Sequence, residues 1–77
     1  MLSYIVVGAD RMCVVVNAEG PEDAVRRLLR LTRDDRKIVQ CQPGFDKYSG
    51  TFTIQNGHTL TVDLTDAERL RLLERKR

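Results

Sequence analysis

Side chains that could carry catalytic or metal chemistry are few and scattered along the chain. His58 is the only histidine, and Cys13 and Cys41 are the only cysteines. A zinc site needs several His or Cys ligands at characteristic spacing, and a nucleophilic site needs a serine or cysteine beside a base. Neither Ser3 nor Ser49 forms a recognisable motif with His58, and no glycine-rich phosphate loop is present. We therefore expect no enzyme activity, no metal and no cofactor.

The two cysteines lie in strand-like segments far apart in the sequence. We expect them to be reduced and partly buried in a cytoplasmic protein, with one disulfide in a secreted protein as the alternative. The segment MLSYIVVG has no positive charge ahead of its apolar run, which argues against a signal peptide. No apolar stretch approaches the roughly 18 residues that a membrane span requires, so we expect no membrane partner.

The stretch RRLLRLTRDDRK, residues 26–37, is the most basic part of a chain whose net charge is only +2. Acids precede or follow several of these bases by one helical turn, and such pairs stabilise a helix. The expected pairs are Glu22–Arg26, Asp23–Arg27 and Arg30–Asp34. The bases left least compensated are Arg33, Arg36 and Lys37, which are therefore candidate partner contacts.

An alternative interpretation of the same stretch is an anion-binding stripe, since aligned arginines can neutralise phosphates. Its residues would be Arg26, Arg27, Arg30 and Arg33. The N-terminal third is acidic instead and offers a second charged surface to a partner. The members of this candidate acidic patch are Asp10, Glu19, Glu22 and Asp23.

The loop GFDKYSG contains two of the four aromatic residues, Phe45 and Tyr48, with Lys47 between them. Aromatic rings on a loop can anchor a protein partner or stack on a base. Alternatively, they cover the open end of a small core. Phe45, Lys47 and Tyr48 are therefore candidate partner-binding residues.

The first half of the chain predicts two strands and a helix. Residues 2–8 and 12–18 are rich in β-branched residues and nearly continuously apolar, which predicts a hairpin covered on both faces. Gly20 and Pro21 suit the start of a helix over residues 21–32. Its apolar stripe, which we expect to pack on the sheet, comprises Ala24, Val25, Leu28, Leu29 and Leu31.

The second half predicts a strand over 37–42, a loop over 43–50 and a hairpin over 51–64. A two-residue turn at Asn56–Gly57 would place Ile54 beside a threonine. We therefore expect a three-residue loop, Asn56 to His58, or a bulge, with Ile54 opposite Leu60.

Residues 65–77 predict a C-terminal helix that begins with the capping-box spacing of Thr65 and Glu68. Its expected packing face comprises Ala67, Leu70 and Leu73. Leu72 lies on the opposite face, which makes it a candidate contact for a partner or for a second copy of the chain.

These elements predict a single α+β domain over residues 1–77, in the order ββαβββα. We expect a mostly antiparallel sheet of about five strands, with one helix packed on a face and a C-terminal helix at an edge or end. From residue 21 onward, the order α-β-β-β-α is similar to that of the double-stranded RNA-binding domain. In that family a lysine-rich cluster opens the last helix and contacts phosphate, whereas here this helix opens with Thr-Asp-Ala-Glu-Arg.

The overall profile also resembles phage-encoded anti-CRISPR proteins, which are very small, cytoplasmic and without a catalytic set. That resemblance implies a non-enzymatic inhibitor that binds a Cas effector in the host cytoplasm and occludes its target DNA. A larger host protein is therefore the expected partner. The alternative function is a small nucleic-acid-binding domain that uses the basic faces of both helices, and a monomer and a homodimer both remain open.

Overall fold

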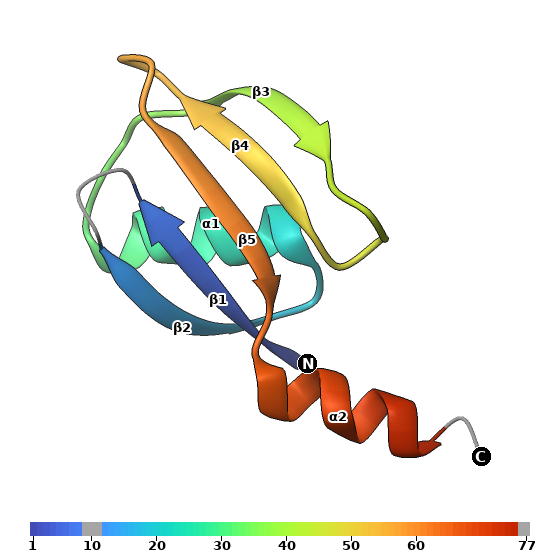
Figure 1. Ribbon diagram of the computed structural model, residues 1–77. Helices are drawn as coiled ribbons and strands as arrows, with labels where there is room; N and C mark the ends of the chain where they lie inside the picture. Colours follow the sequence, from blue (N-terminus) through green and yellow to red (C-terminus); the bar gives the residue numbers. More distant parts are fainter. Residues whose placement is uncertain (9–11, 76–77) are drawn as a thin grey trace.

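The predicted order of strands and helices is confirmed by the structure, a computed structural model that describes residues 1–8 and 12–75, with side chains through Glu74 (Figure 1). The elements are β1 (Leu2–Gly8), β2 (Cys13–Ala18), α1 (Pro21–Leu31), β3 (Ile38–Pro43), β4 (Gly50–Ile54), β5 (Thr59–Leu64) and α2 (Asp66–Arg75). Asp10 of the candidate acidic patch lies outside the described residues.

The five strands form one antiparallel sheet in the order β2-β1-β5-β4-β3. The first strand therefore lies inside the sheet, where it pairs Tyr4 with Leu64 of β5. The two edge strands are β2 and β3. A five-stranded antiparallel sheet with two helices is the α+β fold predicted above.

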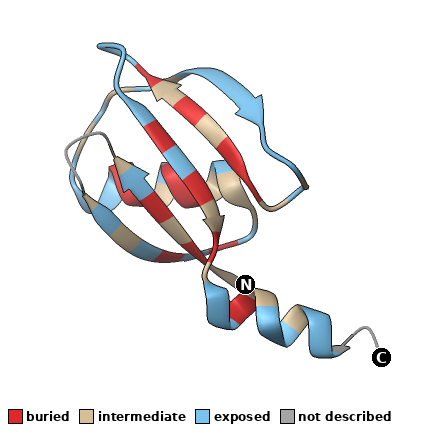
Figure 2. Ribbon diagram, viewed as in Figure 1, coloured by how far each residue is buried: buried red, intermediate tan, exposed pale blue. Residues whose placement is uncertain are grey.

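Helix α1 lies across one face of the sheet and covers the core (Figures 1 and 2). Gly20 is its N-cap and Pro21 its first residue, as predicted. The core is apolar and consists of Tyr4, Val6, Val16, Ala18, Ala24, Val25, Leu28, Leu29, Phe52, Ile54, Leu60, Val62 and Leu64. Leu31 was predicted to belong to this stripe, but its side chain is 73% exposed. It lies at the margin of the stripe in the last helical turn, where the helix ends.

The opposite face of the sheet is open, and the prediction that β1 and β2 are covered on both faces is wrong. Val7 and Val15 of these strands are exposed on that face. The physical reason is that, of the two helices, only α1 lies across the sheet, while α2 extends from one end of it (Figure 1). Their β-branched composition therefore reflects strand propensity as well as burial.

The two cysteines were predicted to be partly buried, and both are exposed and free. Cys13 belongs to an edge strand and shares the open face with Val15. Cys41 pairs with Phe52 on β4, yet it lies on the other edge strand, where α1 does not cover it.

The β4–β5 hairpin has a three-residue loop, but one residue earlier than predicted. The loop comprises residues 55–57, and the Ile54 amide donates to the His58 carbonyl at 2.9 Å. Leu60 consequently pairs with Phe52 and not with Ile54. This slip by two residues keeps every apolar side chain on its predicted face. Asn56 and Gly57 adopt φ angles of 86° and 79°, which allows the tight loop.

The packing face of α2 differs from the prediction. Its start is capped as expected, with the Glu68 amide donating to Thr65 Oγ1 at 3.2 Å. The Glu68 carboxylate, however, accepts the Ser3 amide of β1 at 2.7 Å. That bond turns the Glu68 side of the helix toward the sheet, in place of the predicted face. Leu72, which lies one turn after Glu68 on the same side, therefore packs against the core. The residues predicted to pack, Ala67, Leu70 and Leu73, are exposed instead.

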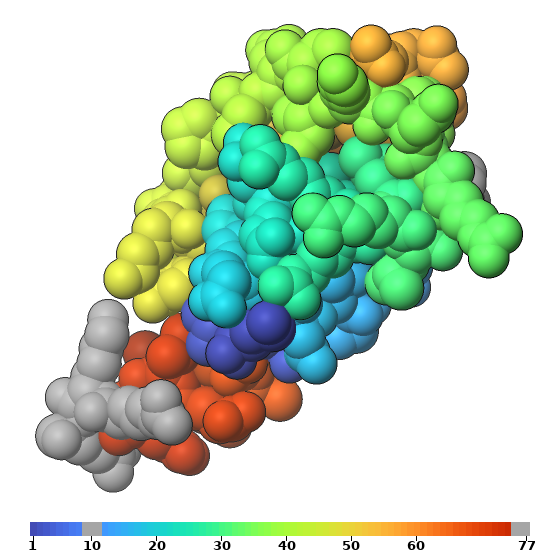
Figure 3. Space-filling model, turned by 180° about the vertical axis from the view of Figure 1, so that it is seen from behind, coloured from blue at the N-terminus to red at the C-terminus, as the bar shows by residue number. Residues whose placement is uncertain are grey.

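The molecule is elongated, with principal extents of 43 × 22 × 21 Å. Figure 3, seen from the side of α1, shows this helix over the sheet and α2 projecting at one end. Within the described residues, neither helix has the length and apolar composition needed to cross a bilayer.

Candidate partner-binding face and basic groove

Phe45 projects from the β3–β4 loop and is 77% exposed, yet the chain around it is held firmly. The loop is closed by a hydrogen bond from the Gly44 amide to the Ser49 carbonyl at 3.0 Å. Inside it, Asp46 Oδ1 accepts the Tyr48 amide at 2.9 Å. Phe45 is therefore displayed by an ordered turn.

Arg69 of α2 connects this loop to the sheet. Its guanidinium donates to Asp46 Oδ2 at 2.8 Å and to Asp63 Oδ1 of β5 at 2.5 Å. The same group lies 4.8 Å from the centroid of the Phe45 ring, within the range of a cation–π contact. Three elements thus converge on one side chain, and the Phe45 ring is fixed without being buried.

The electrostatics of this cluster favour its charged form. The hydrogen bond from Arg69 lowers the pKa of Asp46, with further help from the Tyr48 amide, against the opposing effect of desolvation. The hydrogen bonds to Asp46 and then to Asp63 are the largest causes of the raised pKa of Arg69. The shifts of Asp46 and Arg69 both favour the ion pair between them. We call this arrangement of Arg69, Asp46 and Asp63 around Phe45 the clamp.

A shallow groove of about 270 Å³ runs along the open face beside Phe45. Its floor is formed by Ile5 and Val7 of β1 and by Thr61 of β5, while Phe45 forms one wall. We call this surface, defined by Ile5, Val7, Thr61 and Phe45, the open-face groove. It offers apolar contact area and few polar groups, which suits a protein side chain better than a polar small molecule.

The neighbouring aromatic residue has a different role. Tyr48 is half-buried and packs against the core, with Lys47 Nζ located 5.1 Å from its ring centroid. Burial is the largest cause of the raised pKa of Tyr4, and the nearby Tyr48 adds to it. The sequence left two roles open for these rings, a cover for the core and an exposed contact for a partner. In the structure Tyr48 covers the core and Phe45 is exposed.

The basic residues of α1 line two hollows. The larger, about 540 Å³, lies between α1 and the start of β3. We call it the basic groove; it is lined by Arg26, Leu29, Arg30, Asp34, Arg36, Lys37 and Ile38. Arg27 instead borders a hollow on the other side of α1, beside β2. Arg30 lines both hollows, so it lies between Arg26 on one side of α1 and Arg27 on the other.

Two of the three predicted ion pairs on α1 are confirmed. Arg26 pairs with Glu22 at 3.2 Å, and Arg27 pairs with Asp23 at 2.8 Å. Asp23 Oδ2 also accepts the Glu19 amide at 3.0 Å, and this bond is the largest cause of the lowered pKa of Asp23. Glu22 and Asp23 of the candidate acidic patch therefore stabilise the start of α1.

The third predicted pair, Arg30–Asp34, is wrong, because the helix ends before Asp34. Arg33 adopts a left-handed conformation with φ 56°, and the Asp34 amide donates to the Leu29 carbonyl at 2.8 Å. This is the hydrogen-bond pattern of a Schellman motif. The turn directs Asp34 to Arg36, which it binds through both carboxylate oxygens.

Arg36 is consequently not one of the uncompensated bases. Its hydrogen bonds lower the pKa of Asp34 to about 2. Arg33 and Lys37 do remain without an ion pair to any side chain that the structure describes, as does Arg30. The side chains of residues 75–77, which include the C-terminal bases, lie outside the described residues.

Sequence reasoning missed the residues that organise the site. Arg69, Asp63 and Ile5 were not singled out, because their proximity arises from the pairing of β1 with β5 and from the placement of α2. Leu72 was singled out as a partner contact, but its side chain is partly buried against the core. In the described part of the chain, no three His, Cys, Asp or Glu side chains are grouped to hold a metal ion.

No protein family model, curated protein or solved structure matches this chain. Function is therefore inferred from the surfaces described above.

Proposed function

We propose that this chain is a non-enzymatic protein-interaction module that binds its partner through the open-face groove, with Phe45 as the anchor. The observation that carries the proposal is the clamp of Phe45 by Arg69. An exposed aromatic ring is a common anchor at protein interfaces. A ring that is already fixed loses little conformational freedom on binding, so more of its contact energy contributes to affinity.

The chemistry of the groove favours a protein partner. Ile5 and Val7 give the floor its apolar character, and the hydroxyl of Thr61 beside them donates to the Val7 carbonyl at 3.3 Å. A partner that inserts an apolar side chain beside Phe45 removes apolar surface from water at both contacts. The charged clamp of Arg69, Asp46 and Asp63 then forms part of a polar rim.

The test compares two exposed apolar residues. A partner captured from host lysate is purified, and its affinity for the wild-type chain is measured by calorimetry. Phe45→Ala is expected to weaken this affinity at least tenfold, as for an interface hot spot. Val39→Ala, near the start of β3 and outside the lining of the open-face groove, is the matched control and is expected to leave the affinity unchanged. Equal affinities for wild type and Phe45→Ala would reject the groove as the binding surface.

Inhibition of a Cas effector by steric occlusion is the narrower form of this proposal, and it rests on the resemblance to anti-CRISPR proteins alone. In this form, the wild-type chain prevents a purified effector from binding target DNA, and Phe45→Ala does so at higher concentration only. Undiminished DNA binding at saturating wild-type protein removes this partner and leaves other protein partners to test.

A second candidate function is nucleic-acid binding, favoured by the basic groove. Arg30 and Lys37 line it without an ion pair in the described part of the chain. Titration of duplex DNA and RNA at two salt concentrations tests this function, since each phosphate contact adds to the salt dependence. Arg30→Ala is expected to reduce the slope. Absence of binding at low salt rejects it.

A further inference from the structure

The two edge strands of the sheet differ in how well they resist pairing with another strand. On β3, the register against β4 shifts between Ile38 and Gln40, which leaves Val39 in a bulge, and Pro43 ends the strand. Bulges and prolines are features that prevent edge strands from pairing. By contrast, β2 (CVVVNA) is regular in its register and has no proline, glycine or charged residue.

The hydrogen-bonding groups on the free edge of β2 follow from its register. The Gly8 amide donates to the Met12 carbonyl at 2.8 Å, so this pair is of the hydrogen-bonded type. Because such pairs alternate along an antiparallel ladder, the backbone groups of the odd-numbered residues point away from β1. These residues are Cys13, Val15 and Asn17. Within the described chain, no hydrogen bond reaches their amides or carbonyls.

We propose that a second copy of this chain pairs with β2 along this edge, antiparallel and around a two-fold axis at Val15. Only this register pairs all three outward-facing residues. Val15 meets the same residue of the other copy, and Cys13 meets the partner's Asn17. Each facing pair exchanges two backbone hydrogen bonds. A two-fold contact of this kind is self-complementary and closed, so it produces a dimer and not a fibre.

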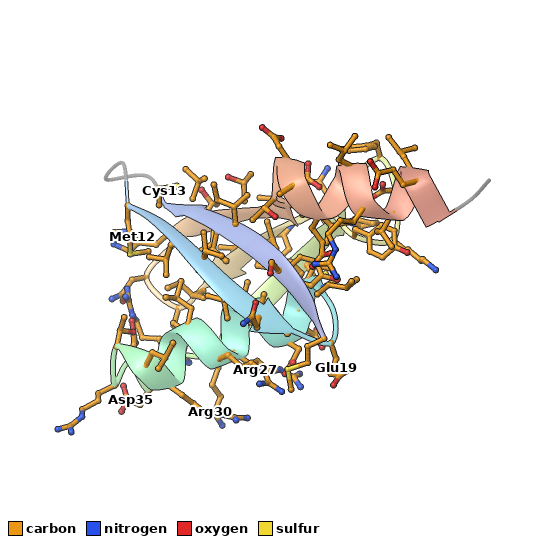
Figure 4. All side chains as sticks on the ribbon, turned by 90° about the horizontal axis from the view of Figure 1, so that it is seen from below. Met12, Cys13, Glu19, Arg27, Arg30 and Asp35 are labelled. Carbon is orange, nitrogen blue, oxygen red and sulfur yellow. The ribbon has the colours of Figure 1, made fainter. Side chains whose placement is uncertain are left out.

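The neighbouring helix supports the choice of a second copy as the occupant. Figure 4 shows α1 running beneath β2, from the end marked by Glu19 toward that marked by Asp35. The acids Glu22 and Asp23 lie in its first turn, where each also pairs with an arginine one turn later. Arg30 lies in its last turn and has no ion pair to a side chain that the structure describes. The two-fold axis sets the two helices antiparallel, so the acidic end of each lies opposite the basic end of the other.

Apolar contact is available at the same edge. A hollow of about 340 Å³ between β2 and α1 is lined by Val16, Asn17, Arg27, Arg30 and Leu31. Leu31, the apolar residue that α1 leaves exposed, borders this hollow. In the dimer, Leu31 covers the line where the two β2 strands pair on the α1 side of the sheet. Val15 covers the same line on the open face. The exposure of both residues in a single copy is thereby explained.

The dimer is tested by light scattering coupled to size exclusion, using two matched variants. Val15 and Val39 are both 61% exposed and lie on opposite edge strands. Wild type and Val39→Lys are expected to have twice the chain mass of 8.8 kDa, whereas Val15→Lys is expected to have the mass of one chain. Two lysines at the axis would repel each other. A wild-type protein of single-chain mass at every concentration would overturn the proposal.

A cross-link tests the register independently. In a Cys13→Ser, Cys41→Ser background, Val15→Cys places two thiols on the axis, within the Cα separation that a disulfide spans. Mild oxidation is expected to convert this variant to a covalent dimer, while Val39→Cys in the same background stays largely single-chain. Equal cross-linking of both variants would show random collision and reject the β2 edge as the interface.

Discussion

The Arg69 guanidinium lies over the ring of Phe45, 4.8 Å from its centroid, while its nitrogen atoms bind Asp46 and Asp63. One side chain of α2 thus fixes the position of an exposed ring on the β3–β4 loop and attaches both to β5. This arrangement separates exposure from mobility, since Phe45 is accessible to a partner and yet restrained. It is also the contact through which α2 can influence the open-face groove.

Removal of Arg69 is expected to affect both stability and binding. Arg69→Ala loses two charge-assisted hydrogen bonds in a half-buried setting, at a cost of about 1–2 kcal/mol in the free energy of unfolding. It also releases Phe45, so partner affinity is expected to fall. Urea unfolding and calorimetry provide the two measurements. Arg26→Ala, which breaks an exposed pair, is the control and is expected to cost about 0.5 kcal/mol or less.

Gly44 provides a second way to disturb Phe45, this time through the backbone. A Cβ at this position would lie 2.3 Å from Ser49 Oγ and 3.0 Å from the Ser49 carbonyl carbon. Gly44→Ala therefore displaces Ser49 and opens the turn, at about 1–3 kcal/mol of stability. Gly20→Ala, with no atom within 4 Å, is expected to cost less, about 1 kcal/mol. Equal losses in the two variants would contradict the close packing of the loop.

Glu68 is expected to hold α2 against the sheet. Its side chain is 4% exposed, and its carboxylate accepts the Ser3 amide. Glu68→Ala leaves that amide without its acceptor and is expected to cost about 1–3 kcal/mol. Glu68→Gln retains an acceptor oxygen and is expected to lose less. Chemical denaturation measures both, with the exposed Glu74→Ala as control; a Glu68→Ala protein as stable as this control would argue against the bond.

The pH dependence of stability is expected to include a contribution from Asp34. Arg36 lowers its pKa to about 2 in the folded protein, compared with the ordinary value of 3.8. Because the folded-state pKa is depressed, this contribution is present above pH 3.8 and is lost as the pH falls toward 2. A carboxyl NMR titration measures the pKa directly. In Arg36→Ala the midpoint should rise toward 3.8; an unchanged midpoint would contradict the assigned cause.

Local signals in the sequence predicted most of the secondary structure. Gly20 and Pro21 marked the start of α1, and the alternation of apolar residues assigned the inner faces of β4 and β5 correctly. The errors concern relations between distant segments. The rotation of α2 depends on the bond between Glu68 and Ser3, and helical periodicity contains no information about this bond.

The candidate site was predicted less completely than the fold. Phe45 was identified because an aromatic residue in a polar loop is conspicuous. The clamp was not identified, since Asp46, Asp63 and Arg69 come together only through strand pairing and the placement of α2. Similarly, the pairing of Asp34 with Arg36 depends on the left-handed conformation of Arg33, which is uncommon for a non-glycine residue.

The position of β1 between β2 and β5 determines when this chain can fold during its synthesis. Tyr4 needs Leu64 as its neighbour, so the sheet stays incomplete until the ribosome has released nearly all of the described residues. Until then, the β1–β2 hairpin and α1 have an apolar face without a partner strand. Pairing across such a separation is slow to form. The apolar face of the β1–β2 hairpin and α1 therefore stays open until β5 is available to pair with β1.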